Sequence, residues 1–477
     1  MSATPIPVNR APFGVDELIA ASGATVRVRP ASATCGVTTD SRAAKAGDLF
    51  VALSGDAHDG HGFVAAAVDA GATAVLVERE VDVPEGVGVL QVDDTLVALG
   101  ALANAHRRRR DIPVVAITGS VGKTSTKELC RAALAGAGFS PMCTRGNLNN
   151  RIGVPMTLFT LDETHDAAVV EAGMNMPGEI SQLAAIIEPT VGLVTAVEAV
   201  HTEGVGNLAG VRAEKGALLE ALGDGATAIY RHRDEMAGFA TDAGVTLSHG
   251  RNEDADVRLV ESTLSGDGTS LTVAVPGRDD PVSLVLPWLG DAAAENATAA
   301  LAVVHAVAPD QLDAAASALS EVGPVVHRMV AERRADGVLL IDDTYNASPA
   351  SIRSALDASA ALASQRGGRL IVVLGDMLEL GRDEQRMHQD VGRDVVKHGA
   401  ARFIACGERM THAGRAALTA SMEGSGPRTQ VVLLRKVEDA ASCAAESLRE
   451  HDVVLVKGSR GMRMERVIAS LVDEVDA

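Results

Sequence analysis

The feature that most constrains this chain is the segment from residue 114 to residue 125, which reads Val-Val-Ala-Ile-Thr-Gly-Ser-Val-Gly-Lys-Thr-Ser. An apolar run typical of a buried strand leads into a glycine loop, and Lys123 and Thr124 then open a helix. Glycines let backbone N–H groups close on phosphate oxygens, the helix N-terminus adds a positive dipole end, and the two side chains supply a charge and a hydroxyl for Mg²⁺. The segment therefore predicts a nucleoside triphosphate site.

The glycine loop is shorter than the long form of this motif, because position 117 is isoleucine and the pattern begins only at residue 119. An ordinary strand-to-helix turn that happens to carry a lysine is the alternative interpretation. The strand, both glycines, the lysine, the threonine and the following helix all agree with the phosphate site instead. The residues predicted to surround the phosphates are Gly119, Ser120, Val121, Gly122, Lys123, Thr124 and Ser125.

Composition limits the partners and the location of the chain. Its 477 residues carry a net charge of −20 and only 2% aromatic residues, which argues against a nucleic-acid binder, since phosphate backbones are held by clustered basic residues. No apolar window of about 18 residues predicts a membrane span, and the first residues lack the pattern of a signal peptide. The five cysteines form no CxxC pair and are interpreted as small buried residues. We therefore expect a cytoplasmic monomer.

The alternation of apolar strands with amphipathic helices predicts an α/β protein of three domains. Residues 1–112 form a small α/β domain, with expected strands at 35–39, 48–52 and 73–77. Residues 113–323 form a central P-loop-type ATPase domain with a parallel sheet, whose expected strands are 114–118, 167–171 and 191–195, followed by a β-rich stretch at 256–285. Residues 324–477 form a C-terminal Rossmann-like domain, with expected strands at 338–342, 370–374, 402–405, 431–434 and 453–456. The basic run at 107–110 is expected to be a solvated helix end or an interdomain linker.

Polar side chains stand where strands of the expected central sheet end. Glu171 ends one strand, where a carboxylate beside a phosphate loop suits Mg²⁺, and His201 follows another and is a further candidate metal ligand, although a lone histidine is usually structural. Glu179 is expected to cap the helix that follows it. Lys215 has acidic neighbours in a helical pattern, and by itself it is interpreted as a surface lysine in a salt bridge.

Three further clusters follow expected strands of the C-terminal domain. The segments 342–349 (Asp-Asp-Thr-Tyr-Asn-Ala-Ser-Pro) and 374–381 (Leu-Gly-Asp-Met-Leu-Glu-Leu-Gly) carry acidic and amide groups that suit an amine or a ribose. For Asp342 and Asp343, helix capping with turn formation is the simpler interpretation. The third cluster places Lys457 and Arg460 at a strand end, where they can meet a phosphate or a carboxylate.

Taken together and in this order, these segments resemble the Mur ligase family. The matching motifs are Thr-Asp-Ser-Arg at 39–42, Gly-Asp-Leu-Phe-Val-Ala-Leu at 47–53, the glycine loop at 119–125, Asn-Leu-Asn-Asn-Arg-Ile-Gly-Val-Pro at 147–155 and the three C-terminal clusters. The resemblance covers nearly the whole chain. It implies one domain for a UDP-sugar peptide, one for ATP and one for the incoming amine.

The resemblance implies an ATP-dependent amide ligase of peptidoglycan precursor synthesis. Such an enzyme turns the carboxyl group of UDP-N-acetylmuramoyl-tripeptide into an acyl phosphate, which the amine of D-alanyl-D-alanine then attacks. The alternatives are another ligase of the family, either one that adds the third peptide residue or a folylpolyglutamate synthetase, and an ATP-binding switch without ligase activity. The third residue of the tripeptide, diaminopimelate or lysine, stays open.

The resemblance also implies roles for individual residues. Thr124, Glu171 and His201 are expected to hold Mg²⁺, with Lys215 as a further, carbamylated ligand, and Lys123 is expected to complete the catalytic set. The other expected contacts with the nucleotide or the acyl phosphate are Asn296, Arg328, Asp342, Asp343 and Lys457. Those expected with the remaining substrates are Ser41, Arg42, Asn147, Asn149, Asn150, Asn346 and Ser348.

Several positions depart from the family pattern. They are Ala292 and Ala293 in place of a His-Asn pair, His327 in place of a glycine, Ala196 in place of an asparagine, and residues 231–234 in place of Asn-x-Asp-Asp. Most of these positions belong to the expected adenine and ribose contacts. We therefore expect those contacts to differ from the family more than the phosphate and metal contacts do.

Overall fold

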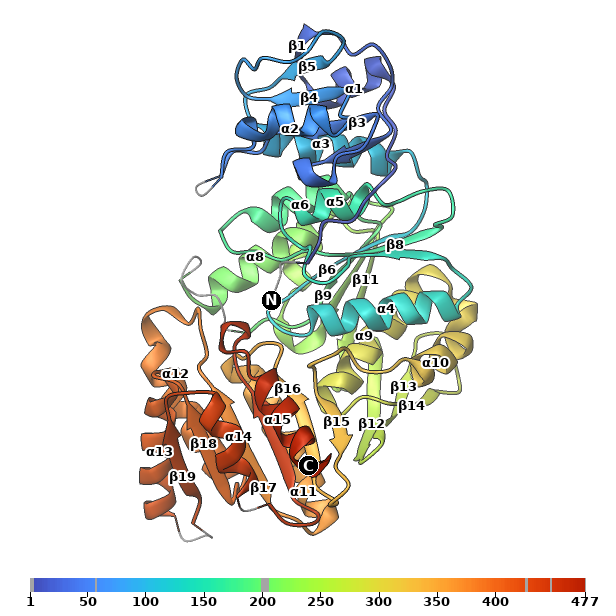
Figure 1. The fold of residues 1–477 in the computed structure, drawn as a ribbon. Coiled ribbons are helices and arrows are strands. Elements are labelled where there is room, and N and C mark those ends of the chain that lie inside the picture. Colours follow the sequence, from blue (N-terminus) through green and yellow to red (C-terminus); the bar gives the residue numbers. More distant parts are fainter. Residues whose placement is uncertain (1–3, 56–57, 199–205, 425–427, 447, 477) are drawn as a thin grey trace.

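The structure is a computed structural model, and it describes residues 4–55, 58–198, 206–424, 428–446 and 448–476. Within these ranges, three sheets follow one another along the sequence. Figure 1 shows the N-terminal sheet at the top, the central sheet in the middle and the C-terminal sheet at the lower left. Helices accompany every sheet, which confirms the expected α/β class.

The N-terminal sheet has five strands in the order β1-β5-β4-β3-β2, and its pairs are parallel except that β1 runs antiparallel to β5. The three expected strands are β2, β3 and β4. The sequence pattern did not indicate β1, a strand of four residues whose apolar side chains Val26 and Val28 are exposed rather than buried. The elements are α1 (Val15–Ser22), β1 (Thr25–Val28), β2 (Gly36–Thr38), β3 (Asp48–Val51), α2 (Val64–Asp69), β4 (Ala74–Val77), β5 (Gly88–Gln91) and α3 (Thr95–Arg108).

The central sheet has nine strands in the order β14-β13-β12-β11-β10-β9-β6-β8-β7. The pairs from β7 to β12 are parallel, and β12, β13 and β14 form an antiparallel extension. Because β9, β6 and β8 are neighbours, the loops after these three strands meet at one edge of the sheet.

The elements of the central part are β6 (Val114–Thr118), α4 (Lys123–Gly136), β7 (Pro141–Cys143), α5 (Gly153–Leu158), β8 (Ala167–Glu171), α6 (Glu179–Ile187), β9 (Val191–Val194), α8 (Leu208–Glu220), β10 (Thr227–Arg231), β11 (Val245–Gly250), β12 (Val257–Ser265), β13 (Gly268–Ala274), β14 (Val282–Leu286), α9 (Asp291–Val307) and α10 (Leu312–Glu321). Residues of α4, α9 and α10 share one apolar cluster with one face of the sheet. Those of α3, α5 and α6 share another cluster with the opposite face.

The C-terminal sheet has six strands in the order β15-β16-β20-β17-β18-β19, and only β15 is antiparallel to its neighbour. The five parallel strands are those expected from the sequence, whereas β15 was not expected. The elements are β15 (Val330–Arg333), β16 (Leu339–Asp343), α11 (Pro349–Arg366), β17 (Leu370–Gly375), α12 (Glu384–Lys397), β18 (Arg402–Cys406), α13 (Met410–Glu423), β19 (Gln430–Leu434), α14 (Glu438–Ala445), β20 (Val453–Lys457) and α15 (Glu465–Asp476).

The hydrophobic cores are not divided equally among the three sheets. One apolar cluster contains Leu49 and Leu99 of the N-terminal part together with Val114 and Val170 of the central sheet. The C-terminal sheet builds two clusters that are almost entirely its own, with Leu289 as the buried contribution from the central part. The N-terminal and central parts are therefore joined by shared apolar packing, whereas the C-terminal part is joined to them mainly by other contacts.

Arg107 is buried, so the expectation that the basic run forms a solvated helix end is wrong for this residue. Its guanidinium group donates to the carbonyl oxygens of Ile187 (2.9 Å) and Glu188 (2.9 Å) at the end of α6, and to that of Arg110 (3.2 Å). The carboxyl end of a helix carries carbonyl groups without partners within the helix, and a cation satisfies them. Arg107 therefore fastens α3 to the central part.

Two other expectations concern membranes and cysteines. Among the described residues, no helix is both long and apolar enough to cross a membrane. All five cysteines are thiols without disulfide partners, but Cys35 is exposed, so the interpretation of all five as buried residues is wrong. Cys35 directly precedes the short edge strand β2, where little chain is available to cover it.

Replacing Arg107 by alanine should lower the stability of the protein, because it leaves buried carbonyl groups of α6 without donors. A loss of about 2 kcal/mol or more is expected for hydrogen bonds to a buried charged group, which should appear as a fall of several degrees in the midpoint of thermal unfolding. Arg108→Ala is the matched control, because that side chain is 66% exposed and forms only a surface ion pair with Glu188. Equal midpoints for the two variants would contradict the role of Arg107.

Candidate active site

The loop between β6 and α4 is held in shape by the loop that follows β9. Gly119 and Gly122 have φ angles of +148° and +88°, which glycine adopts without strain. The Thr195 hydroxyl donates to the carbonyl oxygen of Val121 (2.6 Å), and the N–H group of Ser120 donates to the carbonyl oxygen of Ala196 (2.7 Å). The turn thus places the N-terminus of α4, with its positive dipole end, directly after the glycine loop, as an anion site requires.

Lys123 is the first residue of α4 and folds back over the loop. Its ammonium group donates to the carbonyl oxygens of Gly119 (2.6 Å) and Ser120 (3.4 Å). Burial lowers the pKa of Lys123, and the negative charge of Glu171 opposes this shift. The side chain therefore holds a poorly solvated positive charge at the position where the sequence predicts a phosphate contact.

Glu171 ends β8 and is 2% exposed. Its Oε1 accepts hydrogen bonds from the side-chain amide of Asn149 (2.8 Å) and from the hydroxyl of Thr124 (3.4 Å). Its Oε2 is buried and has no hydrogen-bond partner among the described residues. Such an orphaned acceptor is costly, and a cation beside Thr124 would remove that cost. The two side chains therefore fit Mg²⁺, which prefers oxygen ligands.

The remaining expected metal ligands are His201 and Lys215. His201 lies outside the described residues. Within the described ranges, no group of three or more histidine, cysteine or acidic side chains is arranged to hold a metal ion. The donors seen at this edge of the sheet are thus the oxygens of Glu171 and Thr124.

Lys215 lies on α8 with 2% exposure, so the interpretation as a surface lysine is wrong. Its acidic neighbours in the sequence indicated a salt bridge, but helix α8 packs on β9 and β6, and this position of the helix is buried. Burial lowers the pKa of Lys215 to about 7, the charge of Lys123 acts in the same direction, and Glu214 and Glu179 oppose it. Above pH 7 most of this side chain is therefore a neutral amine, which can react as a nucleophile.

The N-terminus of α6 is capped from another helix. Glu214 of α8 accepts hydrogen bonds from two backbone N–H groups at the start of α6 (2.8 and 3.1 Å). Glu179, which was expected to cap this helix, instead accepts from two N–H groups of the preceding loop (2.6 and 3.0 Å). The expectation is wrong because the carboxylate of Glu179 binds N–H groups of the preceding loop, and Glu214, which is distant in the sequence, binds those at the start of the helix.

Arg328 of the C-terminal part lies beside the phosphate loop. Its Nη2 lies 3.4 Å from the hydroxyl of Thr124, and its guanidinium group lies 4.2 Å from the ring centre of Tyr345. Its Nε is buried and has no hydrogen-bond partner among the described residues. Tyr345 is one of only two tyrosines in the chain, and its place inside an expected motif was the one indication of a role in holding this arginine.

The adjacent residue, His327, adopts a left-handed conformation with φ of +64°, which explains why glycine suits this position in the family. Its Nδ1 lies 2.7 Å from Oδ2 of Asp342, whose Oδ1 accepts from the hydroxyl and the N–H group of Thr344 (2.6 and 3.1 Å). Asp342 therefore stabilises the turn after β16, in agreement with turn formation, but it caps no helix. The N-cap of α11 is Ser348.

Lys457 and Asp343 form a buried ion pair at the same edge of the C-terminal sheet. The ammonium group of Lys457 donates to Oδ2 of Asp343 (2.5 Å) and to the carbonyl oxygen of Asn346 (2.7 Å). Both residues end neighbouring parallel strands, β20 and β16. The pair therefore connects the segment 342–349 to the end of β20.

The expected adenine contact, Asn296, lies on α9 next to the phosphate loop, because a Cβ added to Gly122 would come within 2.8 Å of its Oδ1. The preceding residue, Glu295, forms an ion pair with Arg231, one of the positions that depart from the family. Both side chains are largely buried. Burial and the charge of Arg231 lower the pKa of the nearby His249 to about 3, so this imidazole is neutral.

The residues expected to contact the other substrates are spread over all three parts of the chain. In the N-terminal part, Ser41 begins a short 3-10 helix, and Arg42 pairs with Asp40 (2.7 Å) with its side chain 88% exposed. In the central part, Asn147 accepts from the hydroxyl of Thr4 (2.7 Å), and the Asn150 side chain accepts from two N–H groups at the start of α5. The side chains of Asn150 and Ser348 thus accept hydrogen bonds from backbone N–H groups at the starts of α5 and α11.

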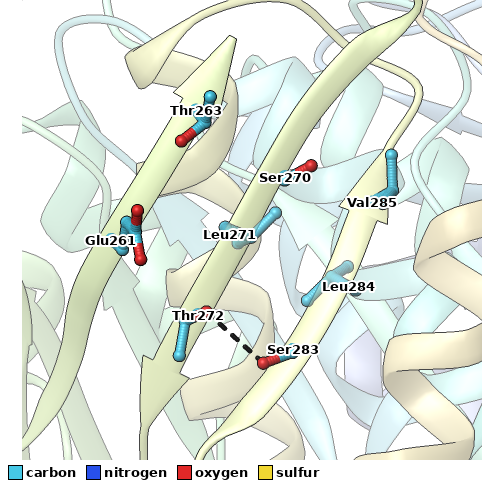
Figure 2. Close-up of a pocket in the computed structure, with 8 residues that line it drawn as sticks. All are labelled: Glu261, Thr263, Ser270, Leu271, Thr272, Ser283, Leu284 and Val285. Atoms are coloured by element: carbon cyan, nitrogen blue, oxygen red, sulfur yellow. Dashed lines mark hydrogen bonds between the residues drawn. The ribbon is translucent and has the colours of Figure 1, made fainter. Parts of the chain in front are cut away.

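A hollow of about 360 Å³ on the antiparallel extension stands apart from these groups. Figure 2 shows it as an open face of β12, β13 and β14, with a hydrogen bond between the hydroxyls of Thr272 and Ser283 (3.3 Å). Glu261 is the one ionisable residue among its lining side chains. Strands β10 and β11 separate this face from β9, so it does not belong to the phosphate loop site.

Three family models match the chain in sequence order. They are the "Mur ligase family, catalytic domain" over residues 34–107, the "Mur ligase middle domain" over residues 117–304 and the "Mur ligase, glutamate ligase domain" over residues 327–460. Together they cover the phosphate loop and most of all three sheets. The chain therefore belongs to the Mur ligase family.

Similar proteins within the family match almost end to end. The UDP-N-acetylmuramoyl-tripeptide–D-alanyl-D-alanine ligase of Escherichia coli (strain K12) is 36% identical over 91% of this chain and 93% of its own length. A crystal structure of MurF from Acinetobacter baumannii has a TM-score of 0.87 at 29% identity and covers 98% of this chain and 100% of its own. A MurF ligase from Thermotoga maritima, in complex with ADP, has a TM-score of 0.80 at 25% identity over 92% and 97% of the two chains.

Replacing Gly119 by alanine should abolish nucleotide binding, because its Cβ would lie 2.1 Å from Oγ1 of Thr195 and its φ disfavours a side chain. Gly138→Ala is the matched control, with φ of +96° and no atom within 4 Å of the added Cβ, and should cost about 1 kcal/mol of stability only. Calorimetric titration with ADP measures the difference. Binding of wild-type strength by the Gly119 variant would contradict this account of the loop.

Proposed function

We propose that this chain is an ATP-dependent ligase that joins D-alanyl-D-alanine to UDP-N-acetylmuramoyl-tripeptide, a step of peptidoglycan precursor synthesis. Relatives that match more than nine tenths of the chain carry this activity in their names. The observation in the structure that carries the proposal is the buried Oε2 of Glu171, an acceptor without a donor among the described residues, beside Thr124 and the phosphate loop. A cation bound to nucleotide phosphates is the partner that such an acceptor suits.

A carboxylate does not react with an amine on its own, and its negative charge is repelled by the phosphates of ATP. The acceptor carboxylate attacks the γ-phosphorus of ATP, a carboxyl O–P bond forms, and the bond from that phosphorus to the ADP oxygen breaks. The dipeptide ammonium group loses one proton, the nitrogen lone pair then attacks the acyl carbon and a C–N bond forms. Phosphate leaves with the C–O electron pair, and the nitrogen loses its second surplus proton. Lys123 and the N-terminus of α4 stabilise the phosphate oxygens by their charge throughout.

The residues proposed to hold Mg²⁺ are Thr124, Glu171, His201 and a carbamylated Lys215, and the ion supplies neutralisation of phosphate charge when it is bound. The proposed nucleotide contacts are residues 119–125 together with Asn296, Arg328, Asp342, Asp343 and Lys457. The 3.4 Å approach of Arg328 to Thr124 supports contact between the C-terminal part and the bound phosphates. Such contact excludes water from the acyl phosphate.

The other substrates are assigned by the same resemblance. We propose that Ser41 and Arg42 bind the uridine nucleotide, and that the segment with Asn147, Asn149 and Asn150 and the segment with Asn346 and Ser348 bind or position the peptide and the amine. The proposed domains are residues 1–112, 113–323 and 324–477, and the proposed location is the cytoplasm, where ATP is available.

The proposed function is tested by product formation and ADP release with purified protein. We expect release to require both UDP-N-acetylmuramoyl-tripeptide and D-alanyl-D-alanine, supplied with either diaminopimelate or lysine at the third position. Lys123→Ala should abolish release while leaving the fold intact, as judged by thermal unfolding. Release of ADP without either substrate would instead indicate an ATP-driven switch, and normal turnover by the Lys123 variant would refute the assigned site.

Carbamylation of Lys215 makes activity depend on CO₂ and on pH. Because the pKa of Lys215 is lowered to about 7, the amine is neutral and reactive above pH 7 and is a protonated, unreactive ammonium below it. Removing CO₂ from the buffer at pH 8 should therefore lower the rate at least tenfold, and bicarbonate should restore it. In a sample exposed to ¹³CO₂, a carbamate signal should appear in the ¹³C NMR spectrum.

Two variants test whether Lys215 is the modified residue. Lys215→Arg places a guanidinium group of similar reach that forms no carbamate, so both the signal and the activity should disappear. Lys397→Arg, at an exposed position of α12, should change neither. A carbamate signal that persists in the Lys215 variant would show that this residue is not the modified one.

A further inference from the structure

A cavity of about 180 Å³ lies between the central and the C-terminal parts. Its walls are formed by Glu198, which follows β9, and by residues of the first turns of α11 and the first half of α12. It is smaller than the range of about 300–1,000 Å³ typical of sites for drug-sized ligands, so it suits a small molecule. The lining residues are Glu198, Pro349, Ala350, Arg353, Arg386, Met387 and Asp390.

Two arginines stand on the C-terminal side of this cavity. Nη1 of Arg353 lies 3.9 Å from Asp394, and Nη2 of Arg386 lies 3.4 Å from Asp383. Both ion pairs are long, and the arginine side chains are 45% and 66% exposed, so water screens the pairs and they contribute little. Both guanidinium groups can therefore turn to an anionic group inside the cavity at small cost.

The opposite charge comes from the central part, next to the phosphate loop. The N–H and C=O groups of Glu198 exchange hydrogen bonds with the hydroxyl of Ser120 (3.0 and 2.9 Å). The carboxylate of Glu198 is 31% exposed and lies 3.5 Å from Arg233, a long and partly solvated pair. A negative charge thus lies at the side of the cavity that is fixed to the place of phosphoryl transfer.

Apolar groups and a second carboxylate complete the lining. Pro349, Ala350 and Met387 present only carbon and sulfur atoms from their side chains. Asp390 already pairs with Arg393 (2.5 Å). The cavity thus offers two cations and the carboxylate of Asp390 on the C-terminal side, the carboxylate of Glu198 on the central side, and an apolar surface from which water is displaced at little cost.

We propose that this cavity binds the incoming dipeptide as a zwitterion, with its carboxylate on Arg353 and Arg386 and its ammonium group toward Glu198. The inference rests on the proposed function. Arginine binds carboxylates through paired hydrogen bonds, and the small side chains of a dialanine fit against Pro349 and Met387. This orientation leaves the dipeptide nitrogen on the side of the phosphate loop, where the acyl phosphate forms. The two arginines thus select an amine whose carboxylate lies one dipeptide length away from its nitrogen.

The test compares two amines in the ligation assay, D-alanyl-D-alanine and D-alanyl-D-alaninamide, which lacks the carboxylate. We expect Arg353→Gln and Arg386→Gln each to raise KM for the dipeptide about tenfold, and the double variant to raise it further. KM for ATP and for the UDP-sugar tripeptide should stay unchanged. For the amide, the variants and the wild type should have equal KM values, because the charge that the arginines bind is absent.

Arg415→Gln is the control, because this arginine is exposed on the next helix, α13, and does not line the cavity. It should leave every KM unchanged. Three results would each overturn the inference. The double variant could leave KM for the dipeptide unchanged, it could raise KM equally for the dipeptide and the amide, or it could raise KM for the tripeptide substrate instead. A wild-type protein that ligates neither amine would refute the proposed function itself, which separates the two failures.

Discussion

The burial of ionisable side chains at one edge of the central sheet is the constraint on which the site depends. Glu171 at the end of β8 and Lys215 on α8 are buried, and Lys123, which follows β6, is partly buried. The parallel order of β6 and β8 places Lys123 and Glu171 at the same edge of the sheet. Away from water, like charges repel strongly and single carboxylate oxygens need partners. The lowered pKa of Lys215 and the orphaned Oε2 of Glu171 are two expressions of this crowding. A cation beside Thr124 would supply the missing partner of Oε2, whereas negatively charged phosphate groups would oppose the lowering of the pKa of Lys215.

Local patterns in the sequence predicted much of this site but not its surroundings. The strand, the glycine loop and Lys123 are adjacent in the chain, so their geometry follows from the order of residues. Glu171 was predicted because strand ends of a parallel sheet share an edge. The burial of Lys215, the cap that Glu214 provides for α6 and the fastening role of Arg107 depend on which distant segment packs against each residue. No periodicity within a single helix contains that information, and strands of only four residues such as β1 and β15 are too short for their sequence pattern to reveal them.

The structure shows how two of the residues that depart from the family pattern are accommodated. His327 accepts the left-handed backbone of a position that favours glycine, at a cost of roughly 1–2 kcal/mol, and its hydrogen bond with Asp342 offsets part of that cost. Arg231 is neutralised by Glu295, a residue of the helix that carries Asn296. Both replacements therefore come with partners of their own. Neither replacement lies in the phosphate loop at residues 119–125.

The division of the hydrophobic cores has a consequence for how this architecture can change over evolution. The N-terminal and central parts share one apolar cluster, whereas the C-terminal sheet packs almost wholly on itself. Substitutions inside the last third of the chain can thus accumulate without disturbing the packing of the rest. A unit that is energetically self-contained behaves as an exchangeable module, and its surface can change while the packing around the phosphate loop is inherited intact.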